Sequence, residues 1–173
     1  FMVQSLMAYE EAGYKVVHKG ENFEIRYYEE RIVIQTRYDS GNSGFRKLFN
    51  YISGQNQGEK KIEMTTPVTE VQDDNQMVMQ FYLPARFNSS SAPLPADNSL
   101  EIATIDAGYF AVIQYSGFAS NKNFYKHAQI LKSSLDRDNI KISSQPIKAT
   151  YNGPFTLPNL RRNEAMYLVL WDN

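Results

Sequence analysis

Alternating apolar and polar residues predict three β-strands in the first forty positions of the chain. The alternation runs through residues 14–19, 23–28 and 31–38, as expected for strands with one face buried. Residues 20–22, Gly-Glu-Asn, have the composition of a turn between the first two of these strands. A polar break follows the third strand, so we expect the next element to be of a different kind.

The next element is predicted to be an amphipathic helix over residues 44–53, which ends at Gly54. Its apolar positions follow the i, i+3, i+4, i+7 spacing of one helix face, and they are Phe45, Leu48, Phe49 and Ile52. Residues 62–71 and 77–83 return to the strand pattern. The first part of the chain therefore ends in two further strands.

The same order of elements is repeated after a Pro- and Ser-rich connection at residues 84–99. A second helix is expected at 121–135, and the strand patterns lie at 100–105, 109–116, 146–151 and 165–171. Both parts read strand, helix, strand, strand. A duplicated half-unit is the simplest account, with the halves at about 14–83 and 100–171.

The connections between these elements predict an α+β fold with a mainly antiparallel sheet. The strands form local hairpins and only one helix interrupts each half, whereas a parallel sheet needs a crossover between every pair of strands. A length of 173 residues fits one domain. We therefore expect a single domain over 13–173, preceded by an extension at 1–12.

The start of the chain has a composition of its own. Residues 1–8, FMVQSLMA, are apolar and uncharged and end in a small residue. Such a segment is the end of a secretory signal, a remnant of cloning, or a strand that docks on the domain. The expected location of the protein depends on which of the three this segment is. It is secreted or periplasmic if the segment is a signal remnant, and cytoplasmic otherwise.

Composition narrows the classes of partner. The 18 Lys and Arg residues balance 19 Asp and Glu residues, so no strong field attracts nucleic acid. No run of about 18 apolar residues occurs, which predicts no membrane span. The chain has no cysteine and only two histidines, His18 and His127, which leaves no Cys-based metal site. We expect a monomer that binds neither nucleic acid nor metal through such ligands.

The motifs of common enzymes are absent from the sequence. Residues 41–45, GNSGF, lack the last glycine of a serine-hydrolase elbow. Residues 54–60, GQNQGEK, lack the spacing of a phosphate-binding loop. No pair of carboxylates has a spacing that suggests acid and base catalysis. We therefore expect a protein that is not an enzyme, with a small hydrolase as the weakest of three hypotheses.

Four segments, taken in order, resemble the SOUL haem-binding protein family. They are FEIRYY at 23–28, the stretch 44–68 that contains KIEMTTPV, FYLP at 81–84 with APLP downstream, and the stretch 151–170 that contains RRNE. The resemblance covers about residues 13–171. It implies two βαββ repeats that form a distorted antiparallel β-barrel flanked by two helices, similar to bacterial drug-sensing effector domains of the GyrI-like fold.

The resemblance also implies a tetrapyrrole ligand, with non-covalent haem as the expected cofactor. A porphyrin needs apolar walls and cations for its carboxylates. The walls would come from Phe45, Leu48, Phe49 and Ile52, and the cations from Arg46, Lys47, Lys60 and Lys61. The same apolar stripe would be needed simply to pack the helix on the sheet, so both interpretations stay open for each residue.

Tyr27 is the residue at which this chain departs from part of the family. Some members carry a histidine there, and that histidine is their proposed iron ligand. Tyr27 would be either a weak axial ligand through its phenolate or a strand aromatic with a hydrogen-bonded hydroxyl. Haem carriage, buffering or sensing is the leading hypothesis. A binding module for another flat apolar ligand or for a protein partner is the alternative.

Overall fold

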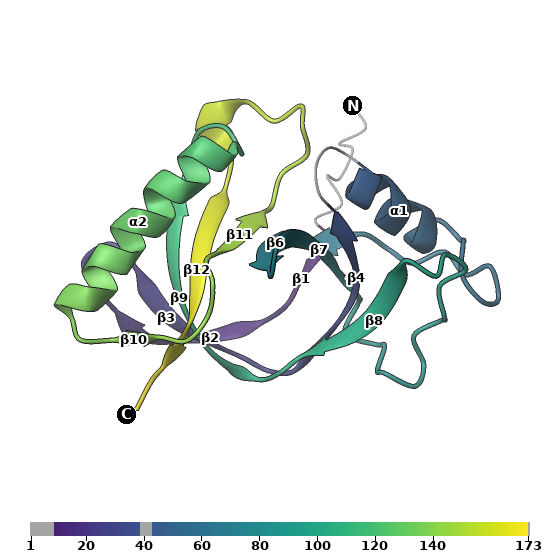
Figure 1. The fold of residues 1–173 in the computed structure, drawn as a ribbon, viewed down its shortest axis with the longest axis horizontal. Helices are drawn as coiled ribbons and strands as arrows, with labels where there is room; N and C mark the ends of the chain where they lie inside the picture. Colours follow the sequence, from purple (N-terminus) through teal and green to yellow (C-terminus); the bar gives the residue numbers. More distant parts are fainter. Residues whose placement is uncertain (1–8, 39–42, 173) are drawn as a thin grey trace, which may run out of the picture.

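The computed structural model describes residues 9–38 and 43–172, which form one large antiparallel sheet, a small two-stranded sheet and two helices (Figure 1). The helices are α1 (Ser43–Ile52) and α2 (Asn121–Arg137), and a short 3₁₀ helix spans Pro158–Leu160. The small parallel sheet pairs β1 (Glu10–Glu11) with β5 (Thr65–Thr66). The large sheet contains β2 (Tyr14–Lys19), β3 (Glu24–Tyr28), β4 (Arg31–Tyr38), β6 (Val68–Asp73), β7 (Gln76–Tyr82), β8 (Leu100–Ile105), β9 (Gly108–Tyr115), β10 (Lys141–Ile142), β11 (Ile147–Thr150) and β12 (Asn163–Leu170).

The large sheet closes into a distorted barrel through two long segments of chain, in which β3 leads into β4 and β8 leads into β9. The strand order is β2-β3-β9-β12-β11-β6-β7-β4-β8, with β10 beside β12. β3 pairs with β9 and β4 pairs with β8, with Tyr28 opposite Gly108 and Arg31 opposite Ile105. The six central strands are β9, β12, β11, β6, β7 and β4. Since β3 continues into β4 and β8 continues into β9, these two pairings connect the first of the six strands to the last. The predicted α+β barrel is confirmed.

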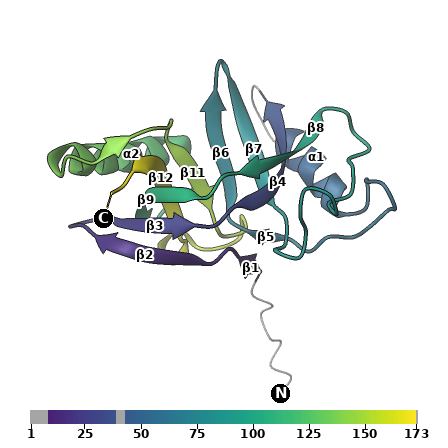
Figure 2. The ribbon, with the colours of Figure 1, turned by 90° about the horizontal axis from the view of Figure 1, so that it is seen from below.

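The helices lie on opposite outer sides of the curled sheet (Figure 1), and the view from below shows them again at its two ends (Figure 2). α1 packs on β4 and β7, whereas α2 packs on β9 and β12. β6 and β11 pair at the centre, so the arrangement reads as two βαββ units side by side. The boundaries 14–83 and 100–171 remain a prediction.

Several elements differ from the sequence prediction at their ends. The strand expected over 62–71 is present as two shorter strands, Thr65–Thr66 and Val68–Asp73, separated by Pro67. The last strand begins at Asn163, two residues before the expected start. The pattern also missed β1, β10 and the 3₁₀ helix, which are too short for alternation to reveal. Of the extension expected over 1–12, residues 1–8 lie outside the described part of the chain, and residues 9–12 contain β1.

α1 contributes only part of its apolar stripe to the core. Leu48, Tyr51 and Ile52 are buried beneath the helix against β4 and β7, while Phe45 and Phe49 remain 42% and 49% exposed. The helix ends where Gly54 adopts a φ of 124°, a conformation that glycine reaches without strain. Two of the four predicted apolar residues, Leu48 and Ile52, therefore pack α1 on the sheet, while the other two, Phe45 and Phe49, remain about half exposed.

The inside of the barrel contains a buried ion pair between β3 and β12. On β3 and β12 alternate residues point inward, and among them are Arg26 and Glu164, 2% and 0% exposed. Two parallel bonds of 2.9 and 2.8 Å join the guanidinium to the carboxylate. Burial lowers the pKa of Arg26, but the bonds and charge of Glu164 outweigh this and leave that pKa above its usual value.

Further groups complete the surroundings of Glu164. The hydroxyl of Tyr151 donates to it at 2.5 Å, and Arg162 donates to it at 3.1 and 3.2 Å. Arg162 also bonds both carboxylate oxygens of Glu11, at 2.9 and 3.0 Å. Burial first, and then the charge of Glu164, raise the pKa of Tyr151 above its usual value. The network therefore ties β1, β3 and β12 to Tyr151, the residue that follows β11.

Substitution of Leu48 should separate core packing from surface exposure on α1. Leu48→Ala removes a fully buried side chain and should lower the free energy of unfolding by about 2–5 kcal/mol. Phe49→Ala, its half-exposed neighbour, is the matched control and should cost about 1 kcal/mol or less. Urea unfolding followed by circular dichroism measures both. Equal losses would contradict the separation.

Substitution of Glu164 should show the cost of removing the fully buried partner of Arg26. Glu164→Gln leaves the guanidinium with only the partly exposed Glu24, at 2.7 Å from its Nε, and should lower the free energy of unfolding by about 3 kcal/mol. Asp73→Asn removes the partner of Arg37 in an ion pair whose two side chains are about half exposed, and should cost about 1 kcal/mol or less. A similar small loss in both variants would contradict the assignment of a desolvated pair.

Candidate functional site

The predicted apolar wall of α1 divides into exposed and buried residues. Phe45 and Phe49 stack with ring centroids 6.2 Å apart and planes 12° apart, and Phe45 also meets the edge of Phe81 at 5.2 Å. Leu48 and Ile52 point the other way, into the core. An external ligand on α1 would therefore touch the two phenylalanines, while the other two residues support the helix from beneath.

The predicted cations surround this helix without forming ion pairs in the part of the chain that the structure describes. Lys47 donates to the hydroxyl of Ser99 at 3.1 Å, and Arg46 is exposed on the same helix. Lys60 and Lys61 are exposed on the loop that follows α1. These four cations and the two phenylalanines form a surface without a described cavity of its own.

Tyr27 lies in a different part of the molecule from the α1 residues. Its strand, β3, pairs with β2 and β9 in the half that α2 covers, and Figures 1 and 2 both place α1 at the opposite end. The residues that the sequence analysis grouped into one site therefore belong to two separate places. Of these residues, Tyr27 borders the groove of about 720 Å³ described next.

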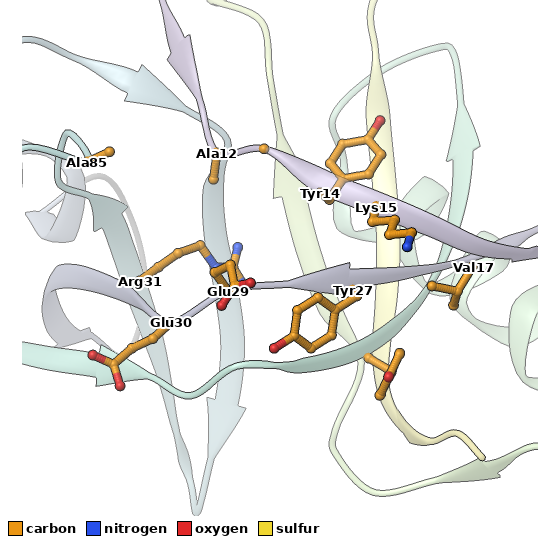
Figure 3. A pocket seen from close by; sticks show the side chains of 11 residues that line it. Ala12, Tyr14, Lys15, Val17, Tyr27, Glu29, Glu30, Arg31 and Ala85 are labelled. Carbon is orange, nitrogen blue, oxygen red and sulfur yellow. The ribbon is translucent and has the colours of Figure 1, made fainter. Parts of the chain in front are cut away.

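This groove, here called the Tyr27 groove, runs where β2 and β3 meet the β3–β4 turn, and its volume is about 720 Å³. That size is within the range of about 300–1,000 Å³ typical of small-molecule sites. Figure 3 shows the side chains from β2, β3 and the turn that border it. The lining residues are Ala12, Gly13, Tyr14, Lys15, Val17, Tyr27, Glu29, Glu30, Arg31, Ala85 and Tyr109.

Two tyrosine rings form an aromatic part of its wall. Tyr27 and Tyr109 are opposite each other on paired strands, with ring centroids 5.2 Å apart and planes tilted by 53°. Both side chains are half-buried, and within residues 9–38 and 43–172 neither hydroxyl makes a hydrogen bond. The two alternatives for Tyr27, a weak axial ligand and a strand aromatic with a hydrogen-bonded hydroxyl, both remain predictions, and its half-buried side chain borders the groove.

Strand alternation explains why Tyr27 faces outward. Arg26 and Tyr28, its neighbours on β3, point into the barrel, where the guanidinium donates to the hydroxyl of Tyr28 at 3.1 Å. Burial raises the pKa of Tyr28 to about 12, although Arg26 acts in the opposite direction. Because side chains alternate across a strand, the buried pair of neighbours sends Tyr27 to the groove.

The charges around the groove are mixed. Lys15 and Arg31 supply two cations, while Glu29 and Glu30 on the β3–β4 turn supply two exposed carboxylates. A second cavity of about 210 Å³ adjoins the groove and shares Arg31, Glu30, Ala12 and Ala85 with it. The combined hollow has apolar and aromatic walls, with charged groups where it meets the β3–β4 turn.

The histidines are engaged in ring contacts. His18 lies 4.9 Å from the ring of Trp171, and the ring of His127 is parallel to that of Tyr115 at 4.0 Å. Among the described residues no cluster of three or more His, Cys, Asp and Glu could hold a metal ion, and no helix is long and apolar enough to cross a membrane. Among the site residues expected from the sequence, Tyr27 is the one that borders the groove.

Sequence reasoning missed most of the groove. Lys15, Val17 and Tyr109 carried no signal beyond strand alternation, and Arg31 appeared only as the first residue of a strand. These residues meet because β2, β3 and β9 are adjacent in the sheet. A pairing register would have placed Tyr109 beside Tyr27, but the sequence alone does not supply that register.

Comparisons with known proteins agree with this architecture. The chain is 27% identical over 172 residues to Heme-binding protein 1 of Xenopus laevis, an alignment that covers 89% of each chain. It is 28% identical over 163 residues to human Heme-binding protein 2, covering 86% of this chain and 78% of that protein.

A solved structure has the same fold at low sequence identity. The EcmrR C-terminal domain superposes with a TM-score of 0.61 at 16% identity, covering 91% of this chain and 98% of that one. This confirms the fold that the family resemblance implied. The family model described as SOUL heme-binding protein matches residues 9–168. The chain belongs to the SOUL heme-binding protein family.

Proposed function

We propose that this chain is a non-enzymatic tetrapyrrole-binding protein and that the Tyr27 groove holds the flat ring. The observation that carries the proposal is a hollow of about 720 Å³ with two tyrosine rings in its wall. Aromatic and aliphatic walls with a few polar groups are the usual environment of a bound apolar ligand. The names of the relatives, both heme-binding proteins, support a tetrapyrrole as that ligand.

The residues of the groove fit haem in chemical type. Tyr27, Tyr109 and Val17 would contact the macrocycle, and Lys15 and Arg31 would be available to its carboxylates. When bound, ferric haem accepts a phenolate as an axial ligand, as some haem proteins show. The hydroxyl of Tyr27 is the group in this wall that would supply one. Carriage, buffering and sensing all require only such reversible binding.

The surface of α1 is the second place where a tetrapyrrole could bind. Phe45 and Phe49 are stacked and half-exposed, and Arg46 and Lys47 lie on the same helix. This surface borders neither of the described cavities, so a ligand there would remain largely in water and gain less from burial. We therefore favour the groove.

A flat aromatic cation is the alternative ligand class for the same groove. Glu29 and Glu30 are exposed at its edge, and carboxylates beside aromatic walls favour a cationic ring. Rhodamine 6G tests this class directly. If it displaces hemin from the protein at equal or lower concentration, the groove binds flat apolar rings in general and is not selective for tetrapyrroles.

Titration with hemin should locate the ligand. The wild-type protein should give a saturable shift of the Soret band and quenching of Trp171 fluorescence at micromolar hemin. The double variant Tyr27→Ala, Tyr109→Ala should bind about tenfold more weakly, because the aromatic walls are lost. The control, Phe45→Ser with Phe49→Ser, should bind like wild type. The reverse ranking would move the ligand to α1, and no saturable change would refute tetrapyrrole binding.

Removal of the Tyr27 hydroxyl should test whether this residue is an axial ligand of the iron. Tyr27→Phe keeps the ring but removes the hydroxyl, so the ferric absorption spectrum should lose its phenolate charge-transfer band while affinity falls only slightly. Tyr109→Phe is the matched control, since Tyr109 is its partner in the same wall, and its spectrum should be unchanged. An unchanged spectrum in Tyr27→Phe would mean that Tyr27 does not ligate iron.

A further inference from the structure

Arg31 is held at the groove by aromatic rings instead of a carboxylate. Its guanidinium carbon lies 4.2 Å from the ring centroid of Tyr28, 4.8 Å from that of Tyr82 and 5.5 Å from that of Phe110. Such contacts attract a cation without neutralising its charge. The rings belong to three different strands, so the guanidinium is fixed from several sides.

The hydrogen-bonding groups of Arg31 are unused within the described residues. Its Nε is buried without a partner, and its guanidinium forms no ion pair with any carboxylate of that part of the chain. Five other arginines differ in this respect, because each has an acidic partner, and they are Arg26, Arg37, Arg86, Arg137 and Arg162. Arg46 and Arg161 also form no ion pair within the described residues, and the Nε of Arg161 is likewise buried without a partner, but neither residue lines the groove or the cavity beside it. Arg31 borders both cavities, and Figure 3 shows its nitrogens among the lining groups.

We propose that Arg31 binds a carboxylate of the molecule held in the Tyr27 groove, so that the groove selects flat apolar acids over their neutral esters. The proposal rests on the proposed function and adds the chemical class of the ligand. A guanidinium offers two parallel N–H groups to a carboxylate. Because the rings already hold Arg31, little side-chain freedom is lost when the ligand binds.

The neighbouring charges set the orientation of the acid. Glu29 and Glu30 are exposed on the β3–β4 turn, where water and salt screen their repulsion. Lys15 is exposed on β2, on the opposite side of the same hollow, and makes no ion pair in the described structure. A carboxylate of the ligand therefore has two cations to approach, and the partly buried Arg31 is the one held in place by rings.

Free-base protoporphyrin IX and its dimethyl ester form the test pair, because they differ in charge and contain no iron. Fluorescence titration of both, in one buffer with dilute detergent, should show the diacid binding to wild type about tenfold or more tightly, as expected for a charge-assisted pair. Arg31→Gln should abolish this preference by weakening the diacid alone. Arg31→Lys should keep part of it, since lysine has charge without the planar fork.

Two further variants make the experiment decisive. Arg37→Gln, on the same strand but half exposed and paired with Asp73, should retain the full preference. Glu30→Gln leaves Arg31 and its rings in place and should raise the affinity for the diacid about two- to threefold without affecting the ester. Circular dichroism and thermal unfolding check the fold of each variant.

The outcomes separate this inference from the function on which it rests. Equal binding of diacid and ester by wild type overturns the role of Arg31 but leaves tetrapyrrole binding intact. Equal weakening of both by Arg31→Gln also overturns it, because Arg31 would then act through packing. Absence of binding by either porphyrin overturns the inference and the proposed function together.

Discussion

A guanidinium inside a protein must be paired, and in this chain the pairing of Arg26 with Glu164 joins strands from opposite ends of the sequence. Both strands flank β9 in the sheet, so the bond crosses over that strand. An unpaired charge in the same place would cost several kcal/mol. The closed barrel therefore depends on bringing β3 and β12 to the same neighbour in the correct register.

This constraint also determines what the outer surface of β3 presents. A shift of β3 by one residue would send Arg26 outward and Tyr27 inward, because neighbouring side chains point to opposite faces. The ion pair thus fixes Tyr27 on the face where Tyr109 lies, and the two rings meet at 5.2 Å. The interior charge pair and the exterior aromatic wall are consequences of a single register.

The helices and the principal strands could be predicted from local periodicity, and the family resemblance supplied the barrel. Arg162 bonds Glu164, two positions along the same chain segment, and also Glu11, which precedes the first of the predicted strands. The pair that is most buried was missed, since a strand arginine flanked by a glutamate reads as surface. Which arginine is desolvated depends on strand pairing over 138 positions, which local patterns do not contain.

The candidate site was harder to predict than the fold because residues of the same type pack the core in one place and lie on the surface in another. On α1 the periodicity identified four apolar residues, but burial divides them into two that hold the helix and two that face water. At the groove, Arg31 is an ordinary charged residue in the sequence and becomes unusual only through rings from three strands. A cation that the fold holds without neutralising keeps most of its attraction for an acid. For that reason Arg31, which borders the groove without an acidic partner, is more informative about ligand binding here than the five arginines that have one.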